Sequence, residues 1–164
     1  MKTLLLMRHA KSSWDNPDQV DHDRPLNARG RQAAPRMAHW LEQQALVPDL
    51  IVSSTAVRAR ETTQRMLTLW SNVSLQLQDQ LYLAPPEHLA AAVRQFPAEY
   101  SRVLLVAHNP GLSDWLSELT GTERHFPTGA IAVLELPVEN WADWNGAAPL
   151  PLIRFQTPKS LPAE

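Results

Sequence analysis

Residues 3–9 read TLLLMRH, an apolar run of strand length that ends in two basic side chains. The pattern recurs at residues 50–52 and 102–107, two further apolar runs that also give way to polar residues. Each run is followed by a segment whose apolar residues stand three or four apart, the spacing of a helix face. Apolar runs without alternation are typical of strands buried on both faces, as in parallel sheets. This order predicts an α/β fold with a mostly parallel central sheet and helices on both faces.

Capping signals and spacing predict the elements around these runs. Asn27 is the expected N-cap of one helix, and Asn109 that of a later helix with Pro110 at its first position and Gly121 just past its end. The helices are expected over residues 34–45, 56–70, 89–96 and 112–119. Further strands are expected at residues 73–77, 130–136 and, at an edge of the sheet, 150–155.

The composition is that of one ordinary globular domain. The chain has 164 residues, 44% of them apolar, and we expect a domain over residues 1–156 and a short C-terminal tail over residues 157–164. The absence of cysteine excludes disulfides, cysteine-ligated metal sites and a thiolate nucleophile. The net charge of −2 lacks the basic excess of nucleic-acid-binding domains, and no apolar run approaches the length of a membrane span. We therefore expect a cytoplasmic protein with neither a nucleic acid nor a membrane as partner.

Basic side chains follow three of the predicted strands. Arg8 and His9 follow the first, Arg58 opens the helix after the second, and His108 follows the third. In parallel α/β folds these strand ends meet at one edge of the sheet, where ligands bind. Half-buried cations gathered in one place cost energy unless an anion compensates them, so the four residues predict an anion site. No cluster of His, Asp and Glu has metal-ligand spacing, and we expect no metal.

The same segments resemble the histidine phosphatase superfamily, whose members have a phosphoglycerate mutase-like fold. Residues 8–15, RHAKSSWD, resemble its signature Arg-His-Gly-Glu-Ser-x-Trp-Asn, with Ala, Lys and Asp in place of Gly, Glu and Asn. Residues 53–58 resemble its Ser-x-x-x-x-Arg segment, and His108 matches its second histidine. The small SixA-type phosphohistidine phosphatases are more similar still, on DRPLNARG at 23–30, LYLA at 81–84 and TPK at 157–159.

The resemblance implies a role for each residue of the site. His9 attacks the phosphorus and carries the phosphate as phosphohistidine, while His108 stabilises the transferring group. Guanidinium forks hold the phosphate oxygens, supplied by Arg8, Arg58 and, from a loop expected to be more mobile, Arg24. Further phosphate contacts are expected from Ser12, Thr128 and the start of the helix at Asn109. No metal or other cofactor is required, because the arginines take over the electrostatic role.

A missing acid bears on the substrate. Family members that act on alkyl phosphates carry a carboxylic acid near the position of residues 82–84, whereas this chain has no Asp or Glu between Leu81 and Pro86. A phosphorylated imidazole leaves as a ring whose conjugate acid has a pKa of about 6.5, so it needs little help from an acid. The absence of this acid favours a phosphohistidine substrate. The sequence leaves open that another acid takes its place, the candidates being Asp21, Asp23 and Glu87.

The chain also has few residues left to form a lid over the site, because most of residues 59–107 belong to predicted helices and strands. An open site accepts a side chain that stands on another protein, whereas small molecules are usually enclosed more fully. The sequence therefore predicts a phosphatase for a phosphohistidine protein of a phosphorelay or a phosphocarrier system. The alternatives are a small-molecule phosphomonoesterase of the same superfamily and a non-catalytic phosphohistidine-binding module.

Overall fold

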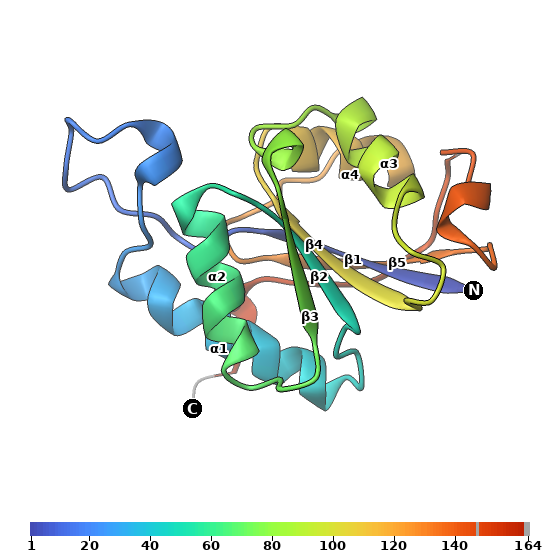
Figure 1. Ribbon diagram of the computed structural model, residues 1–164, viewed down its shortest axis with the longest axis horizontal. Helices are drawn as coiled ribbons and strands as arrows, with labels where there is room; N and C mark the ends of the chain where they lie inside the picture. The colour runs from blue at the N-terminus through green and yellow to red at the C-terminus, as the bar shows by residue number, and fades with distance from the viewer. Residues whose placement is uncertain (147, 163–164) are drawn as a thin grey trace.

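A six-stranded sheet forms the middle of the computed structural model, which describes residues 1–146 and 148–162 (Figure 1). Its strands are β1 (Lys2–Arg8), β2 (Leu50–Ser54), β3 (Ser74–Gln78), β4 (Arg102–Ala107), β5 (Ile131–Leu136) and β6 (Leu152–Gln156). They lie in the order β3-β2-β4-β1-β5-β6. The first four in this order run parallel, whereas β5 is antiparallel to β1 and β6 is antiparallel to β5. The sheet is thus mixed, and mostly parallel as predicted.

Helices cover both faces of the sheet (Figure 1). They are α1 (Ala28–Gln43), α2 (Val57–Leu67), α3 (Pro86–Arg94) and α4 (Gly111–Thr120). Helices α1 and α2 pack on one face, and α3 and α4 on the other. Single 3-10 turns add η1 (Asp21–Asp23), η2 (Asp79–Leu81), η3 (Trp141–Asp143) and η4 (Pro158–Ser160).

Strand β1 shows why this sequence needs two helical layers. Successive side chains of a strand point to opposite faces, so a run of leucines presents apolar groups on both. Leu4 and Leu6 pack with the α3 and α4 side, whereas Leu5 and Met7 pack with the α1 and α2 side. All four are 0% exposed. Full burial of each such side chain stabilises the fold by about 1.5–3 kcal/mol, which only a covered sheet provides on both faces.

The predicted helices and strands are present, but the helices begin and end up to six residues from the predicted bounds, as in α1, which begins at Ala28 and not at residue 34. Asn27 caps α1, because its side chain accepts a hydrogen bond from the Gly30 amide at 2.9 Å. Helix α4 begins one residue later than predicted, at Gly111, and Gly121 ends it in the left-handed conformation at φ 75°. The Asn109 side chain still accepts from the Ser113 amide at 3.1 Å, so it satisfies a free amide of the first turn.

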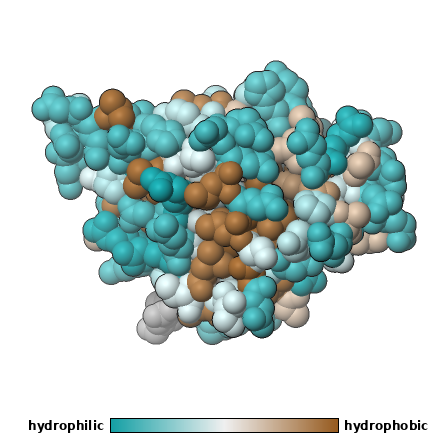
Figure 2. Space-filling view, in the orientation of Figure 1, coloured by the Kyte–Doolittle hydropathy of each residue, from teal (hydrophilic) through white to brown (hydrophobic). Residues whose placement is uncertain are grey.

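The two edges of the sheet differ in how they meet their surroundings. Figure 2 shows hydrophobic surface in the middle of the face on which β3 lies, and Leu77 of this edge strand is 44% exposed. The other edge strand, β6, matches the edge strand predicted from residues 150–155.

Within the described part of the chain, no helix is both long enough and apolar enough to cross a membrane.

The last described residues lie against the first helix. The 3-10 turn η4 contacts α1, and Leu161 packs partly against the core on that side of the sheet. Residues 163 and 164, the end of the tail predicted at 157–164, lie outside the described residues. The division into a domain over 1–156 and a tail stays a prediction.

The connections create a crevice between β1 and β4. These strands are neighbours in the sheet, but the helix after β1 packs on one face and the helix after β4 packs on the other. A point where connections diverge in this way leaves a gap at the carboxyl ends of the strands, and ligands of α/β proteins bind there. His9 and His108 directly follow β1 and β4, respectively.

Candidate active site

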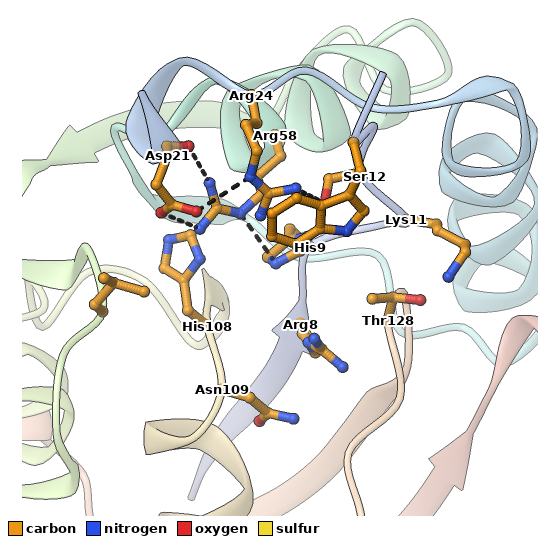
Figure 3. A pocket seen from close by; sticks show the side chains of 12 residues that line it. Arg8, His9, Lys11, Ser12, Asp21, Arg24, Arg58, His108, Asn109 and Thr128 are labelled. Atoms are coloured by element: carbon orange, nitrogen blue, oxygen red, sulfur yellow. Dashed lines mark hydrogen bonds and ion pairs between the residues drawn. The ribbon is translucent and has the colours of Figure 1, made fainter. Parts of the chain in front are cut away.

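A cavity of about 340 Å³ opens at this crevice (Figure 3). All seven site residues predicted from the sequence line it: Arg8, His9, Ser12, Arg24, Arg58, His108 and Asn109. The same wall contains Thr128, which was also expected there, together with Lys11, Trp14, Asp21 and Leu83. The fold therefore gathers residues that are up to 120 positions apart, from Arg8 to Thr128, around one hollow.

The two histidines are neighbours in this cavity and both are neutral. Their ring centroids are 5.2 Å apart, and His9 and His108 are 5% and 2% exposed. Burial, followed by the charge of the neighbouring His108 and of nearby arginines, holds the pKa of His9 well below its usual value. Burial and the charge of Arg58 lower the pKa of His108 to about 3. At neutral pH each ring therefore has one nitrogen with a free electron pair.

The hydrogen bonds of His9 decide which of its nitrogens carries the ring proton. Nδ1 lies 2.7 Å from the carbonyl oxygen of Ala10. A carbonyl can only accept, so Nδ1 carries the proton. Nε2 accepts from the Nε–H of Arg58 at 3.3 Å, which is consistent with this tautomer. His9 therefore presents a lone pair on Nε2, beside a guanidinium group.

Ser54 favours the opposite tautomer on His108. Its Oγ lies 2.8 Å from His108 Nε2 and accepts from the Ala56 amide at 3.2 Å. The hydroxyl proton of Ser54 then has Nε2 as its acceptor within the described residues, which leaves the ring proton on Nδ1. Nδ1 is buried, has no hydrogen-bond partner in the described part of the chain, and lies on the pocket side of the ring (Figure 3). It is a donor without an acceptor.

Arg58 and Arg24 are fixed guanidinium groups. Arg58 is 3% exposed and donates to the backbone oxygen and the carboxylate of Asp21, at 2.7 and 3.0 Å. Arg24 is 7% exposed, donates to Ser12 Oγ at 2.8 Å, and stacks on the Trp14 ring at 3.6 Å from its centroid. The sequence favoured a mobile Arg24, whereas these contacts hold its side chain in place.

Arg8 reaches the cavity from the end of β1. One of its terminal nitrogens donates to the Phe126 carbonyl at 3.2 Å, and the Asn109 side chain donates to the same oxygen at 2.9 Å. The Nε–H of Arg8 is buried and has no partner among the described residues. Burial, and next the charge of Arg58, lowers the pKa of Arg8, as expected where cations meet without an anion.

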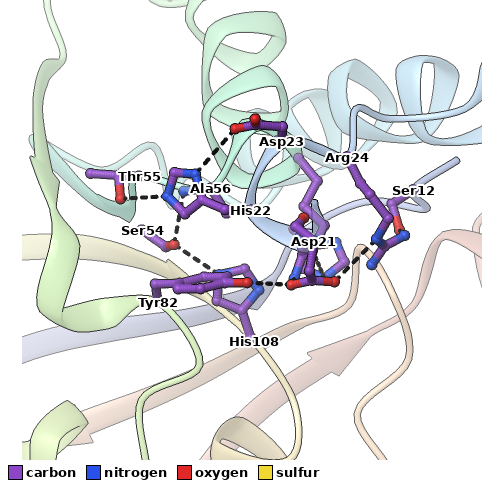
Figure 4. A network of polar contacts seen from close by, with 12 residues as sticks. Ser12, Asp21, His22, Asp23, Arg24, Ser54, Thr55, Ala56, Tyr82 and His108 are labelled. Carbon is purple, nitrogen blue, oxygen red and sulfur yellow. Dashed lines mark hydrogen bonds and ion pairs between the residues drawn. The ribbon is translucent and has the colours of Figure 1, made fainter. Parts of the chain in front are cut away.

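Asp21 is one of the three acids that the sequence left open, and it lies at the cavity. It bridges Arg24 and Arg58 and accepts a hydrogen bond from the Tyr82 hydroxyl (Figure 4). Partial burial raises its pKa, but the hydrogen bonds from Tyr82, Arg58 and Arg24 outweigh this and lower the pKa to about 2. Of the three candidate acids, Asp21 lines the cavity, and Asp23 and Glu87 do not. A signal for it was present in the acidic residues that directly precede Arg24.

Cations and neutral donors therefore dominate the cavity. Asp21 is the one carboxylate in its lining as described, and it is ionised. Among the described residues, no group of three or more His, Cys, Asp or Glu side chains is placed to hold a metal ion. Arg8 and His108 line the cavity and each has a buried N–H without a partner among the described residues, so the cavity suits a tetrahedral anion.

Known proteins are similar to this chain in sequence and in fold. A family model of the histidine phosphatase superfamily (branch 1) matches residues 4–82. An uncharacterized protein of Mycobacterium tuberculosis strain H37Rv is 32% identical over 166 residues, which cover 93% of this chain and 100% of the relative.

Two solved structures are similar over nearly their whole length. A protein assigned as the phosphohistidine phosphatase SixA of Agrobacterium tumefaciens superposes with a TM-score of 0.82, at 31% identity over 95% of this chain and 97% of that chain. One assigned in the same way from Nakamurella multipartitia gives 0.81, at 31% identity over 96% of both chains. The chain therefore belongs to the histidine phosphatase superfamily, and it is of the SixA type.

Proposed function

We propose that the protein is a metal-independent phosphohistidine phosphatase that acts on a protein of a phosphorelay or phosphocarrier system. One observation carries the proposal. His9 lines a cavity together with three guanidinium groups, and its Nε2 lone pair accepts a hydrogen bond from one of them, Arg58. Two other residues of the lining, Arg8 and His108, each have a buried N–H, on Nε and Nδ1, that lacks a partner in the described structure. A neutral nucleophile among such donors suits a phosphoryl group, whose charge spreads over three oxygens during transfer.

The chemistry has two steps. First, the hydrogen bond from the Arg58 Nε–H passes from His9 Nε2 to a phosphoryl oxygen, and the freed lone pair of Nε2 attacks the phosphorus. The P–N bond to the substrate imidazole breaks, and that ring, already protonated on its other nitrogen, leaves with the electron pair as neutral imidazole. In the second step, water attacks the phosphorus, the bond to Nε2 breaks, and phosphate leaves while His9 regains its lone pair. Arg8, Arg58 and the His108 Nδ1–H hold the equatorial oxygens in both steps.

The state of Asp21 supports a P–N bond as the bond that breaks. An alkoxide leaving group needs a proton from an acid, and a carboxyl group with a pKa of about 2 is ionised at neutral pH. The Tyr82 hydroxyl donates to that carboxylate, and burial, followed by this hydrogen bond, raises its own pKa. An imidazole, with its conjugate acid near pKa 6.5, leaves without such help.

The rim of the cavity supports a protein as the substrate. Trp14 and Leu83 line the cavity and are 76% and 50% exposed. Exposed aromatic and aliphatic side chains beside a site are typical anchors of protein interfaces. A phosphohistidine on the surface of a folded partner reaches a cavity of this kind without the movement of a lid.

The test compares phosphate release, in excess chelator, from phosphohistidine proteins, free phosphohistidine and alkyl phosphates. We expect the phosphohistidine compounds to be hydrolysed at least about tenfold faster, and His9→Ala to abolish turnover with an unchanged circular dichroism spectrum. A quench without acid, with labelled substrate, is expected to trap phosphate on His9 and not on His108.

Each alternative predicts a different result in this assay. Faster release from alkyl phosphates would identify a small-molecule phosphomonoesterase, and binding without release would identify a binding module. Label on a serine, or wild-type rates in His9→Ala, would refute the assigned nucleophile. Activity that is lost in chelator and restored by one divalent ion would refute metal independence.

A further inference from the structure

A second hollow, of about 440 Å³, adjoins the cavity just described. The two share Lys11 and Thr128, so one continues into the other at these residues. Its far side is formed by α1 and by the turn η4, which contact each other. None of the roles assigned to the active site uses this hollow.

Four cations line the hollow, which we call the basic groove: Lys11, Arg29, Arg36 and Lys159. No acidic side chain lines it, and none of the four cations forms an ion pair within the described parts of the chain. This is a local excess of positive charge on a protein whose net charge is −2. Unpaired cations gathered along a groove create a positive potential that attracts anions.

The form of the groove favours a polypeptide over a small anion. Lys11, Arg29 and Lys159 are exposed, whereas the small side chains of Ala33 and Pro158 between them are half-buried. The charges thus stand at the rim of a partly apolar trough. Small ligands are usually enclosed, whereas rim charges around an apolar strip are typical of protein interfaces.

We infer that the basic groove binds an acidic segment of the substrate protein, next to the phosphohistidine that enters the cavity. The inference rests on the proposed function and adds a charge requirement to its substrate. Because the groove begins at the cavity wall, the carboxylates belong to residues close to the phosphohistidine on the partner's surface. Such contacts strengthen encounter and ground-state binding, and leave the transfer of the phosphoryl group unchanged.

The experiment uses three phosphohistidine peptides of equal length, in which glutamate, glutamine or lysine flanks the phosphohistidine, together with free phosphohistidine. The test variant is the triple charge reversal Arg29→Glu, Arg36→Glu, Lys159→Glu, which leaves the cavity-lining Lys11 in place. The matched control is the triple reversal Arg65→Glu, Arg94→Glu, Arg154→Glu, because these arginines are exposed and line neither hollow.

The wild type is expected to prefer the glutamate peptide over the glutamine peptide by about tenfold in kcat/KM, through KM, and to lose this preference at high salt. The groove variant is expected to lose or invert the preference with kcat unchanged. It should still hydrolyse free phosphohistidine at the wild-type rate, and the control should behave as the wild type on every substrate.

The outcomes separate the two proposals. Equal kcat/KM on all three peptides, with free phosphohistidine hydrolysed, would overturn the groove inference and leave the proposed function intact. No hydrolysis of any phosphohistidine compound would overturn the proposed function and the inference with it. If the groove variant instead lost as much activity on free phosphohistidine as on the glutamate peptide, the groove would act on the phosphoryl group itself and the inference would be wrong.

Discussion

Ser54 is a residue whose effect on catalysis passes through another side chain. Its hydroxyl lies 2.8 Å from His108 Nε2, and the tautomer this favours places a donor on the cavity side of the ring. We expect Ser54→Ala to lower kcat by about 10-fold to 100-fold, because His108 can then present a lone pair in place of an N–H to the phosphoryl oxygens. Nitrogen NMR of the His108 ring should show the proton moving from Nδ1 toward Nε2.

The neighbouring serine offers a matched control. Ser53 is equally buried, but its hydroxyl donates to the Ser54 carbonyl at 2.9 Å and does not reach His108. Ser53→Ala should therefore leave the His108 tautomer and kcat nearly unchanged. Equal losses of kcat in the two variants, with an unaltered tautomer in Ser54→Ala, would show that Ser54 only packs.

The arginines are expected to differ in their kinetic effects. Arg8 lines the cavity and Arg58 donates to His9 Nε2, so in the proposed mechanism both hold the phosphoryl group. Arg8→Lys and Arg58→Lys keep the charge, lose the fork, and should lower kcat by about 10²–10³. Arg24→Lys should raise KM more than it lowers kcat, because Arg24 is tied to Ser12 and Trp14 at the side of the cavity.

Arg36→Ala provides the reference for these variants, since Arg36 lines the basic groove and not the cavity. On free phosphohistidine it should leave kcat/KM close to the wild-type value. If it proved as damaging as Arg58→Lys, the site would have been assigned to the wrong edge of the sheet.

The sequence predicts some of these residues better than others, for a physical reason. His9 and His108 directly follow apolar strands, so the geometry of a parallel sheet brings them to one edge. Asp21 and Arg24 lie in the irregular segment between β1 and α1, where no hydrophobic period fixes the path of the chain. Asp21 pairs with Arg58, 37 residues away along the chain, and local pattern does not encode such a contact.

At the level of elements, the start of α1 supports the loop that carries Ser12. A Cβ atom on Gly30 would lie 2.1 Å from the backbone oxygen of Lys11, and that oxygen also accepts from the Asn27 amide at 3.0 Å. Only a residue without a side chain allows this approach. The first turn of the helix and the Ser12 loop are therefore in backbone contact.

Gly30→Ala should consequently displace the loop or the helix. We expect a loss of about 1–3 kcal/mol in the free energy of unfolding, as for overpacking, together with a higher KM for free phosphohistidine. Urea unfolding and steady-state kinetics measure the two effects. Ala28→Gly, exposed in the same turn, should cost no more than about 1 kcal/mol and leave KM unchanged. A stabilised Gly30→Ala protein would contradict the close approach.

The antiparallel direction of β5 is a property that the hydrophobic pattern of the sequence does not predict. The run at residues 130–136 predicts a buried strand, and Ile131–Leu136 is one, but an apolar run reads alike in either direction. After α4, residues 121–130 return along the sheet to the site edge, where the Phe126 carbonyl accepts from Arg8 and Asn109. Ten extended residues reach about 33 Å, enough for this return. The antiparallel direction thus results from a segment without regular structure.

On the scale of the whole molecule, the fold collects positive charge at one end of the sheet while the net charge stays at −2. The parallel strands and the divergence of α1 and α4 place the cavity there, and η4 against α1 extends it as the basic groove. This concentration of positive charge lowers the free energy of unfolding, and the buried core on both faces of the sheet must offset the loss. Because two histidines are held neutral in this environment, the free energy of unfolding depends on pH.

Acid should therefore destabilise the protein from a higher pH than carboxylates alone would require. The folded state lowers the pKa of His9, and that of His108 to about 3, whereas both are near 6.5 in the unfolded chain. Below about pH 6.5 the unfolded chain binds more protons, so stability is complete above this pH and falls as the pH drops toward 3. Asp21, with its pKa lowered to about 2, adds a loss only below its unfolded value near 3.8.

Between about pH 7 and pH 4.5 the histidines therefore dominate the change. His108 alone, two pH units below its unfolded pKa, should cost about 3 kcal/mol, which corresponds to a fall of roughly 5–10 °C in Tm for a chain of this size. Calorimetry across this range measures the slope. The double variant His9→Gln, His108→Gln should flatten it, whereas His39→Gln, at an exposed position on α1, should keep it. A wild-type Tm that stayed constant over this range would mean that folding leaves the pKa of both rings near 6.5, which would contradict their burial as neutral groups.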